Sequence, residues 1–247
     1  MSSKVVALIP ARLESSRLPR KALVDICGLP MIVHVLKRCQ RAKSLDEVIV
    51  ATDNAEIRDA VEKAGGRVIM TRSDHQTGSD RIAEAASKLD CSIVVNIQGD
   101  EALVKPEHVD AAVRGLQADP EAGIALLVNP FKKYQSPSDI KVVLDERGYV
   151  MYLSRADIPS GARTPQPPML KAYHVVPFRK AFLLEYAAWP KGALEQIEFN
   201  EYLRILEKGR RIRAVHVDSS AVSVDTAADL EFVRGEMAKD ALFAEYR

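Results

Sequence analysis

The chain has almost no excess of charge and no long apolar run. Its 247 residues carry 35 basic and 34 acidic side chains, which gives a formal net charge of +1. Binding to a long polyanion usually requires a clear basic excess, so we expect no nucleic-acid partner. No segment approaches the roughly 18 apolar residues of a membrane span, and the first apolar run is too short for a secretory signal. We therefore expect no membrane partner and a cytoplasmic location.

Cysteine is scarce, and two common phosphate-binding motifs are missing. Cys27, Cys39 and Cys91 are odd in number and share no CxxC spacing, which argues against a disulfide framework and a structural zinc site. We interpret all three as buried or neutral thiols. GxxxxGK[ST] does not occur, and no GxGxxG follows a predicted strand. A P-loop nucleotidase and a standard dinucleotide-dependent oxidoreductase are therefore not supported.

The first half of the chain alternates β-branched runs with amphipathic segments. Strands are predicted at residues 5–9, 47–52, 67–70 and 92–100, and helices at 30–42, 54–65, 79–89 and 105–119. Ser79 is the candidate N-cap of the third of these helices. Strands and helices in alternation build an α/β fold with a mostly parallel sheet and helices on both faces.

After residue 123 the pattern changes. Strands are predicted at residues 124–129, 140–154, 170–179 and 212–217, the second of them folded into a hairpin across the turn at 146–148. An amphipathic helix is predicted at 193–209 and a C-terminal helix from about Thr226. The segment 155–169 is rich in proline and glycine, and we interpret it either as a functional arm or as a plain surface connection.

The loop after the first strand concentrates positive charge. It holds Arg12, Arg17, Arg20 and Lys21, together with two serines at 15–16. Guanidinium groups offer paired donors to phosphate oxygens, and lysine offers a mobile point charge. The charges alone would equally suit a solvated surface loop. However, ligands of parallel α/β sheets bind beyond the carboxyl ends of the strands, and this position favours a triphosphate site.

Two acidic residues and one polar segment complete the candidate site. Asp100 follows a buried strand, and Asp225 stands between a strand and the C-terminal helix. Carboxylates in these places suit Mg²⁺, although either could simply cap a helix or turn. The segment SDHQTGSDR at 73–81 could close over a nucleotide, or it could be a loop with a helix cap. His75 has no partner at metal-ligand spacing.

Four segments resemble the 3-deoxy-manno-octulosonate (Kdo) cytidylyltransferases. They are IPARLESSRLPRKAL, TRSDHQTGSDR, VNIQGDE and VDTAADLEFVR. Linking segments such as GLPMIVHV, VIVATDN, IKVVLDERGYVMYLSRADIP and LEQIE occur in the same order, so the likeness covers nearly the whole chain. The resemblance implies a nucleotide-diphospho-sugar transferase-like fold and a homodimer. It also implies an enzyme that transfers CMP from CTP to the hydroxyl of an acidic sugar and releases pyrophosphate.

The resemblance also implies roles for individual residues. Arg12, Ser16, Arg17 and Lys21 would bind the CTP phosphates, and Asp100 and Asp225 would hold Mg²⁺, so that no dedicated protein base is required. Further residues expected around the base, the ribose or the sugar acid are Thr77, Ser79, Arg81 and Gln98. The whole chain, residues 1–247, would be one nucleotidyltransferase domain. Its subregion of approximately 130–205 would bind the acceptor and form the dimer.

The acceptor side departs from the family pattern. Where the family reads HLGIYGYR this chain reads AYHVVPFR, which puts Ala172 and Val176 in place of two hydrogen-bonding side chains and leaves His174 two positions later. EQLR becomes EYLR, which introduces Tyr202, and RLPGK becomes RLPRK, which introduces Arg20. The acceptor-binding set is then His174, Glu201, Tyr202 and Arg204, together with Gln98.

These departures leave three interpretations open. The acceptor could be another acid, such as a modified octulosonate, a different 2-keto sugar acid or a phosphonate, because losing a hydrogen-bonding group changes acceptor preference. Alternatively, His174 does the work of the family's histidine. A non-catalytic CTP-binding paralogue is disfavoured, since both Asp100 and Asp225 are retained. Whether the product feeds lipopolysaccharide, a capsule or a small-molecule pathway stays open.

Overall fold

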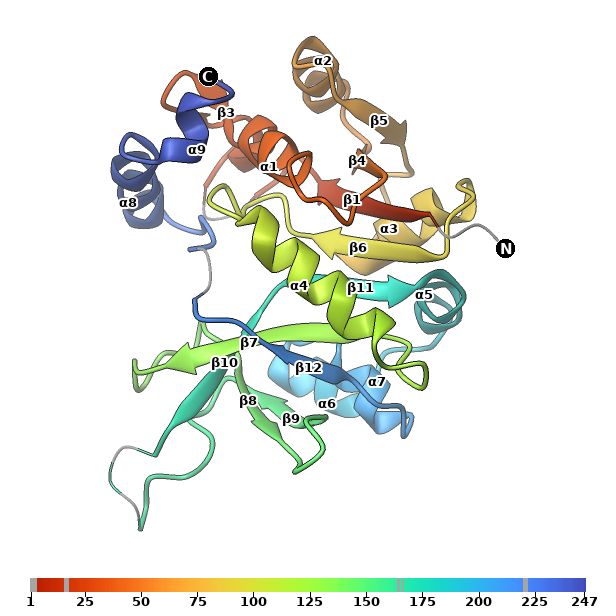
Figure 1. Ribbon diagram of the computed structural model, residues 1–247, viewed down its shortest axis with the longest axis vertical. Coiled ribbons are helices and arrows are strands. Elements are labelled where there is room, and N and C mark those ends of the chain that lie inside the picture. The colour runs from red at the N-terminus through yellow and green to blue at the C-terminus, as the bar shows by residue number, and fades with distance from the viewer. Residues whose placement is uncertain (1–3, 16–17, 164, 166, 220–221) are drawn as a thin grey trace. The chain divides into compact units, whose positions relative to one another are not determined.

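The computed structural model describes residues 4–15, 18–163, 165, 167–219 and 222–247. The chain forms two compact units, the first comprising Met1–Asp110 and Ala221–Arg247 and the second Ala111–Ser220. Helices flank the sheet strands of the α/β architecture (Figure 1). Among the described residues, no helix is both long and apolar enough to cross a membrane.

The first unit contains four parallel strands in the order β6-β1-β4-β5. Their bounds are Val5–Ala11 for β1, Glu47–Thr52 for β4, Arg67–Met70 for β5 and Ile93–Ile97 for β6. All of β1 is buried, as is all of β6. Strands covered on both faces read as continuous apolar runs rather than as an alternation. The four strands predicted for the first half of the chain are therefore confirmed.

Helices cover these strands, and a short hairpin lies between β1 and α1. The bounds are Met31–Cys39 for α1, Ala55–Lys63 for α2, Gly78–Ser87 for α3 and Pro106–Gln117 for α4, which crosses the boundary between the units. Between β1 and α1 lie the 3₁₀ turn η1 (Lys21–Leu23) and the paired strands β2 (Asp25–Ile26) and β3 (Leu29–Pro30). The turn of this hairpin leaves Cys27 exposed, whereas Cys39 and Cys91 are buried.

The predicted N-cap of α3 is wrong by two residues. Thr77 takes the extended cap conformation, and its side chain accepts the backbone N–H of Asp80 at 3.1 Å. The Asp80 carboxylate accepts the backbone N–H of Thr77 in return, which completes a capping box. Ser79 lies inside the first turn of the helix and is fully buried, so it cannot serve as the cap.

The C-terminal segment returns to the first unit and packs on the β2–β3 hairpin. Helix α8 (Ala227–Met237) buries Leu230, Val233 and Met237 in a cluster with Ile26 and Met31. The short helix α9 (Ala241–Ala244) follows it. Apolar burial of this extent stabilises the docked helix. Because Asp225 lies next to Thr226, the N-cap of α8, the packing of the helix fixes where that carboxylate lies.

The second unit is built on a mixed sheet in the order β12-β7-β10-β8-β9. The bounds are Ala125–Phe131 for β7, Lys141–Leu144 for β8, Val150–Ser154 for β9, Met169–Tyr173 for β10 and Arg213–His216 for β12. β12 runs parallel to β7, and the other neighbours are antiparallel. The predicted hairpin is confirmed as β8–β9. The strand predicted at 170–179 is divided at His174 into β10 and β11 (Val175–Arg179), and α5 (Lys180–Ala187) follows.

The single helix predicted at 193–209 is wrong. Two helices occupy this segment, α6 (Ala193–Glu198) and α7 (Leu203–Glu207). Phe199 ends α6 in the left-handed conformation, with φ 50°, and the Asn200 side chain accepts the backbone N–H of Tyr202. Asparagine competes in this way with helical hydrogen bonding and interrupts the helix. Helix α7 buries Leu203 and Ile205, whereas α6 buries only Glu195 and leaves Ile197 exposed.

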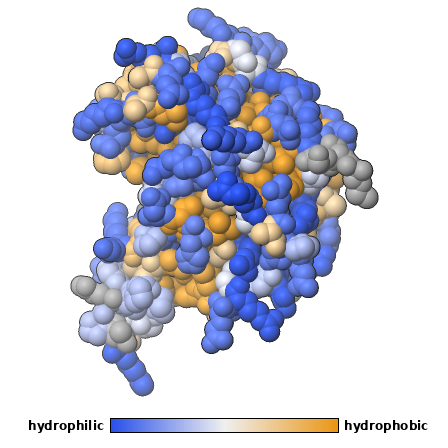
Figure 2. Space-filling model, viewed as in Figure 1, coloured by the Kyte–Doolittle hydropathy of each residue, from blue (hydrophilic) through white to orange (hydrophobic). Residues whose placement is uncertain are grey.

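Apolar side chains also reach the surface. In Figure 2 they appear over α8 and over the sheet strands of the second unit, within a face that is otherwise mostly hydrophilic. Large exposed apolar residues of the second unit include Met151, Ile197 and Phe199. A group of such side chains is typical of a surface that contacts another protein.

Candidate active site

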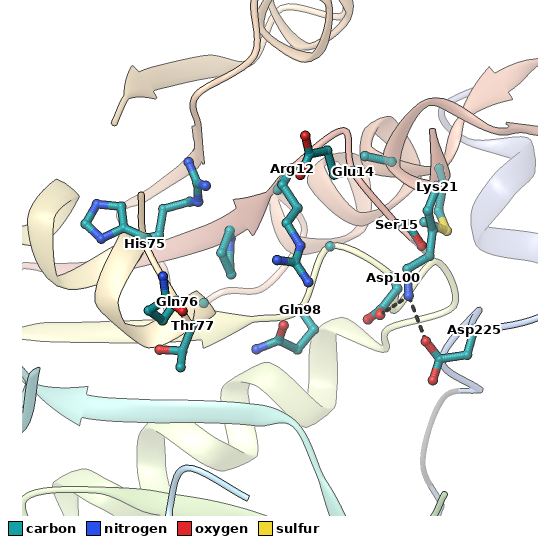
Figure 3. Close-up of a pocket in the computed structure, with 17 residues that line it drawn as sticks. Arg12, Glu14, Ser15, Lys21, His75, Gln76, Thr77, Gln98, Asp100 and Asp225 are labelled. Carbon is teal, nitrogen blue, oxygen red and sulfur yellow. Dashed lines mark hydrogen bonds and ion pairs between the residues drawn. The ribbon is translucent and has the colours of Figure 1, made fainter. Parts of the chain in front are cut away.

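A cavity of about 270 Å³ lies at the carboxyl ends of β1 and β6. Its size is near the lower end of the ~300–1,000 Å³ of typical ligand pockets, so it would enclose only part of a nucleoside triphosphate. Figure 3 shows the side chains that line it. They come from the loop after β1, the start of α3, the loop after β6 and the residue before α8. All of these segments belong to the first unit.

Two glycines allow these loops to meet. A Cβ at Gly99 would lie 3.0 Å from the carbonyl oxygen of Pro10 and 3.3 Å from a methyl group of Ile32. A Cβ at Gly78 would lie 3.2 Å from the ring of Pro10. Glycine at both positions lets the end of β1 contact the loop after β6 and the start of α3. Polar side chains from distant parts of the sequence are thereby brought to one cavity.

Lys21, Asp100 and Asp225 meet at one side of the cavity. The Lys21 ammonium donates to Asp100 at 2.6 Å and to Asp225 at 2.9 Å (Figure 3). A backbone hydrogen bond of 3.1 Å from Val224 N to the carbonyl of Asp100 joins the two acidic segments. Burial by itself would lower the pKa of Lys21, but the carboxylates of Asp100 and Asp225 outweigh it and raise the pKa above its ordinary value. The lysine therefore stays charged at neutral pH.

The two carboxylates fit a hard divalent cation. They already share one cationic group, the ammonium of Lys21, and both are only partly exposed. Among the described residues, no group of three or more histidine, cysteine, aspartate or glutamate side chains forms a metal cage. Mg²⁺ is usually held by one or two carboxylates with water and substrate phosphates as the remaining ligands. Asp100 and Asp225 match that kind of site.

The basic loop is described in part. Arg12 is exposed and lines the cavity together with Lys21. Ser16 and Arg17, both predicted phosphate contacts, lie outside the described residues. Arg20 adopts the left-handed conformation and pairs with Glu56 instead of lining this cavity.

Only some of the residues predicted to bind the nucleotide around α3 line the cavity. Thr77, Arg81 and Gln98 line the cavity, whereas Ser79 is buried within α3 and does not. Arg81 is 4% exposed, and its guanidinium donates to Thr71 at 2.6 Å and pairs with Asp53 at 3.2 Å. These contacts hold the base of the loop that precedes α3.

His75 also lines the cavity, and its partner was not identified from the sequence. Its Nε2 lies 2.6 Å from the Glu84 carboxylate. Glu84 also accepts the backbone N–H of Arg72 and the ammonium of Lys88. Burial alone would raise the pKa of Glu84, but Lys88, the Arg72 amide and His75 together lower it to about 2. Metal-ligand spacing could not reveal this pair, because Glu84 acts as an orienting group from the second turn of α3.

Four of the predicted acceptor residues, His174, Glu201, Tyr202 and Arg204, lie in the second unit, whereas Gln98 lies in the first. His174 stacks on Tyr202 with ring centroids 6.2 Å apart, and Tyr202 is 2% exposed. Arg204 is buried and donates two hydrogen bonds of 2.7 Å to Glu195, and its guanidinium lies over the ring of Tyr186. The backbone carbonyl of Glu201 accepts the Tyr186 hydroxyl at 3.0 Å.

The two altered positions, on the consecutive strands β10 and β11, are buried. Ala172 pairs with Val128 across β10 and β7 and is 1% exposed, and Val176 on β11 is fully buried. Both side chains are aliphatic and offer no hydrogen bond.

Comparison with known proteins agrees with this geometry. The family described as Cytidylyltransferase matches residues 6–212. The 3-deoxy-manno-octulosonate cytidylyltransferase of Syntrophobacter fumaroxidans is 44% identical over 98% of this chain and 100% of its own length. The enzyme of the same name from Escherichia coli is 39% identical over 96% of this chain and 98% of its own length.

A solved structure gives the same result. CMP-2-keto-3-deoxy-manno-octonic acid synthetase, complexed with CTP, superimposes with a TM-score of 0.92 at 39% identity and covers 96% of this chain and 99% of its own. The sequence match, the fold and the convergence of Lys21, Asp100 and Asp225 point the same way. This chain is a nucleotidyltransferase that belongs to the cytidylyltransferase family.

Proposed function

We propose that this protein transfers CMP from CTP to the hydroxyl of Kdo or a close relative, with release of pyrophosphate and with Mg²⁺ as its cofactor. The observation that carries the proposal is the convergence of Asp100 and Asp225 on Lys21 beside the basic loop after β1. The relatives named for Kdo cytidylyl transfer, which align over nearly the whole chain, support the choice of substrates.

The residues at the cavity would divide the work between phosphate binding and orientation. Arg12 and Lys21 would hold the triphosphate while the acceptor hydroxyl attacks the α-phosphorus in line, and both cations would then stabilise the charge that grows on the departing pyrophosphate. Thr77 and Gln98 would contact the nucleoside. Ser16 and Arg17 stay predictions, as does the role of Ser79.

Asp100 and Asp225 would hold the Mg²⁺. When bound, this ion would supply charge neutralisation at the α-phosphate and would lower the pKa of the acceptor hydroxyl. The protein would then need no dedicated general base. Each carboxylate lies within hydrogen-bonding distance of Lys21. The Lys21 ammonium and the Mg²⁺ would therefore act on the phosphates of the same CTP.

A different acidic acceptor is the second candidate. Ala172, Val176 and Tyr202 replace hydrogen-bonding residues of the family pattern, and all three side chains are buried. A pocket without those groups discriminates among acceptors by shape, and one lost hydrogen bond is worth about 1–3 kcal/mol. The candidates are a modified octulosonate, another 2-keto sugar acid or a phosphonate, to which His174, Glu201, Tyr202 and Arg204 would contribute.

We further propose a homodimer in the cytoplasm, where CTP is available. The exposed apolar side chains Met151, Ile197 and Phe199 fall within the approximate subregion 130–205 that we assign to acceptor binding and dimerisation. We treat residues 1–247 as one catalytic domain made of the two compact units. Light scattering of the purified protein would test the dimer, with a monomer as the contradicting result.

The test of the function is pyrophosphate release from CTP and Mg²⁺ with a panel of acceptors. The panel holds Kdo, 8-amino-Kdo, sialic acid and simple phosphonates, with ATP, GTP and UTP as nucleotide controls. Efficient turnover with Kdo would support the first candidate, and turnover only with another acid would support the second. CTP binding without turnover across the panel would contradict both.

A further inference from the structure

Arg20 is held in an unfavourable backbone conformation next to a residue of the active site. Its φ and ψ are 57° and 31°, in the left-handed region, and it directly precedes Lys21. Non-glycine residues avoid this region because Cβ approaches the backbone too closely. Such a residue persists only where surrounding contacts hold it, and these positions cluster at functional sites.

The contact that holds Arg20 is an ion pair with Glu56. The guanidinium donates to the two carboxylate oxygens at 3.2 and 2.5 Å, which makes the pair bidentate. A bidentate pair fixes the orientation of the planar guanidinium as well as its position. Both side chains are 55% exposed, so water and salt reach the pair freely.

Glu56 is itself firmly placed. It lies in the first turn of α2, directly after β4, and its backbone N–H donates to the capping side chain of Asn54 at 2.9 Å. A carboxylate in the first turn of a helix is favoured by the helix dipole. Since β4 is the sheet neighbour of β1, the pair connects the loop after β1 to the helix that follows β4.

Arg20 determines the direction in which Lys21 leaves the loop. It is the N-cap of η1, and its carbonyl accepts the backbone N–H of Leu23 at 2.8 Å. A change of φ or ψ at Arg20 would rotate η1 and move the Lys21 ammonium away from Asp100 and Asp225. Arg20 itself does not line the catalytic cavity; it lines a more open depression that shares Arg12 and Ser15 with that cavity.

We infer that the Arg20–Glu56 pair is a clasp that keeps residue 20 in the left-handed conformation and thereby positions Lys21 for the triphosphate. This inference rests on the proposed function, because it assigns the clasp to the same CTP site. Arg20 and Glu56 are positioning residues, and neither contacts the reacting groups. Glycine at position 20 would adopt the same conformation without a partner, so it should make the clasp unnecessary.

That property gives a rescue experiment. CTP affinity in the presence of Mg²⁺ is measured by calorimetry for the wild type, Arg20→Ala, Glu56→Gln, Arg20→Gly and the double variant Arg20→Gly with Glu56→Gln. Arg20→Ala and Glu56→Gln should each weaken CTP binding roughly fivefold, of the order expected when one strained residue relaxes. Arg20→Gly should bind CTP like the wild type, and Glu56→Gln should then have no further effect.

Ionic strength provides a second readout. Because the pair is exposed, raising the salt concentration should weaken it, so CTP affinity should fall more steeply with salt in the wild type than in Arg20→Gly. Asp59→Asn is the matched control, since Asp59 is also a carboxylate of α2 in an exposed pair, with Arg58. This control should leave CTP affinity and its salt dependence unchanged.

Three results would overturn the clasp. Equal loss of affinity in Arg20→Gly and Arg20→Ala would show that the guanidinium binds phosphate directly. An undiminished effect of Glu56→Gln in the Arg20→Gly background would show that Glu56 acts on another group, and unchanged affinity in every variant would show that the pair is only a surface contact. Failure of the proposed function would give a different result from failure of the clasp. In that case the wild type would bind CTP but release no pyrophosphate with any acceptor.

Discussion

The two regions that the sequence marked as functional are organised in opposite ways. In the first unit, the charged side chains Lys21, Asp100 and Asp225 contact one another at the wall of a cavity and stay partly exposed. In the second unit, Tyr202 and Arg204 are buried, and the Arg204 guanidinium is paired with Glu195. Charged groups left at a cavity wall can exchange their partners for a ligand, whereas buried and paired groups stabilise the fold.

The difference shows that a motif residue can serve a site in two ways. Lys21 would act on phosphate directly, since its partners are carboxylates that can also bind a metal ion. Arg204 holds α6 and α7 together through Glu195 and carries an aromatic ring of Tyr186 against its guanidinium. Its contribution to acceptor binding would come from shaping the wall. Variants on each side separate these roles.

The largest effect is expected at the carboxylates of the first unit. Asp100→Asn should lower kcat/KM about 10²–10³-fold, because it removes a metal ligand and one anionic partner of Lys21. Steady-state pyrophosphate release at saturating Mg²⁺ measures this. Asp59→Asn, which alters an exposed carboxylate outside the cavity, is the control. Activity within tenfold of the wild type would remove Asp100 from the proposed mechanism.

Breaking the buried pair of the second unit should affect stability instead. Arg204→Met leaves the Glu195 carboxylate buried without its cation, so we expect the free energy of unfolding to fall by about 3 kcal/mol. Arg210→Met breaks the exposed pair with Glu185 and should cost less than about 1 kcal/mol. Denaturant unfolding measures both, with KM for CTP unchanged. A stable Arg204→Met variant with a raised acceptor KM would mean instead that Arg204 binds the acceptor.

Sequence patterns predicted the fold of the first unit well, because its strands are continuous β-branched runs that end at polar loops. The sequence also predicted that those loops meet at one site, because parallel strands place their carboxyl ends at one edge of the sheet. The break between α6 and α7 was not predicted. The apolar periodicity of the sequence continues through it, although the Asn200 side chain accepts a backbone N–H and so competes with helical hydrogen bonding. The sequence showed that Arg20 replaces a glycine of the family pattern, but it did not predict the left-handed backbone conformation of Arg20.

Side-chain partners were the least predictable feature. The Glu84 carboxylate meets His75 only because the loop before α3 folds back on the helix, and no spacing rule anticipates this. Similarly, the pattern EYLR made Arg204 a candidate acceptor contact, and only the structure shows that its guanidinium is paired with Glu195. Local periodicity in the sequence predicts helices and strands, whereas side-chain partners depend on how those helices and strands pack together.

A smaller effect is expected from restoring a hydrogen-bonding side chain in the second unit. Tyr202→Gln should lower KM for Kdo on the order of tenfold while KM for CTP stays constant, since an amide can bond an acceptor hydroxyl. Tyr202→Phe, which keeps the ring contacts with His174 and Phe178, should leave KM for Kdo unchanged. An unchanged KM in both variants would show that residue 202 does not face the acceptor.

The smallest effect concerns Glu84, whose carboxylate accepts hydrogen bonds from the Arg72 amide, Lys88 and His75 and has a pKa lowered to about 2. A lowered pKa in the folded state means that the carboxylate stabilises the fold above its ordinary pKa of 4.5, and that this contribution is lost as pH falls toward 2. Because water reaches the group, we expect Glu84→Gln to lower the free energy of unfolding by only about 1 kcal/mol at pH 7. The difference from the wild type should shrink between pH 5 and pH 3 in urea titrations. A difference that stayed constant across this range would show that the contribution of Glu84 does not depend on its charge.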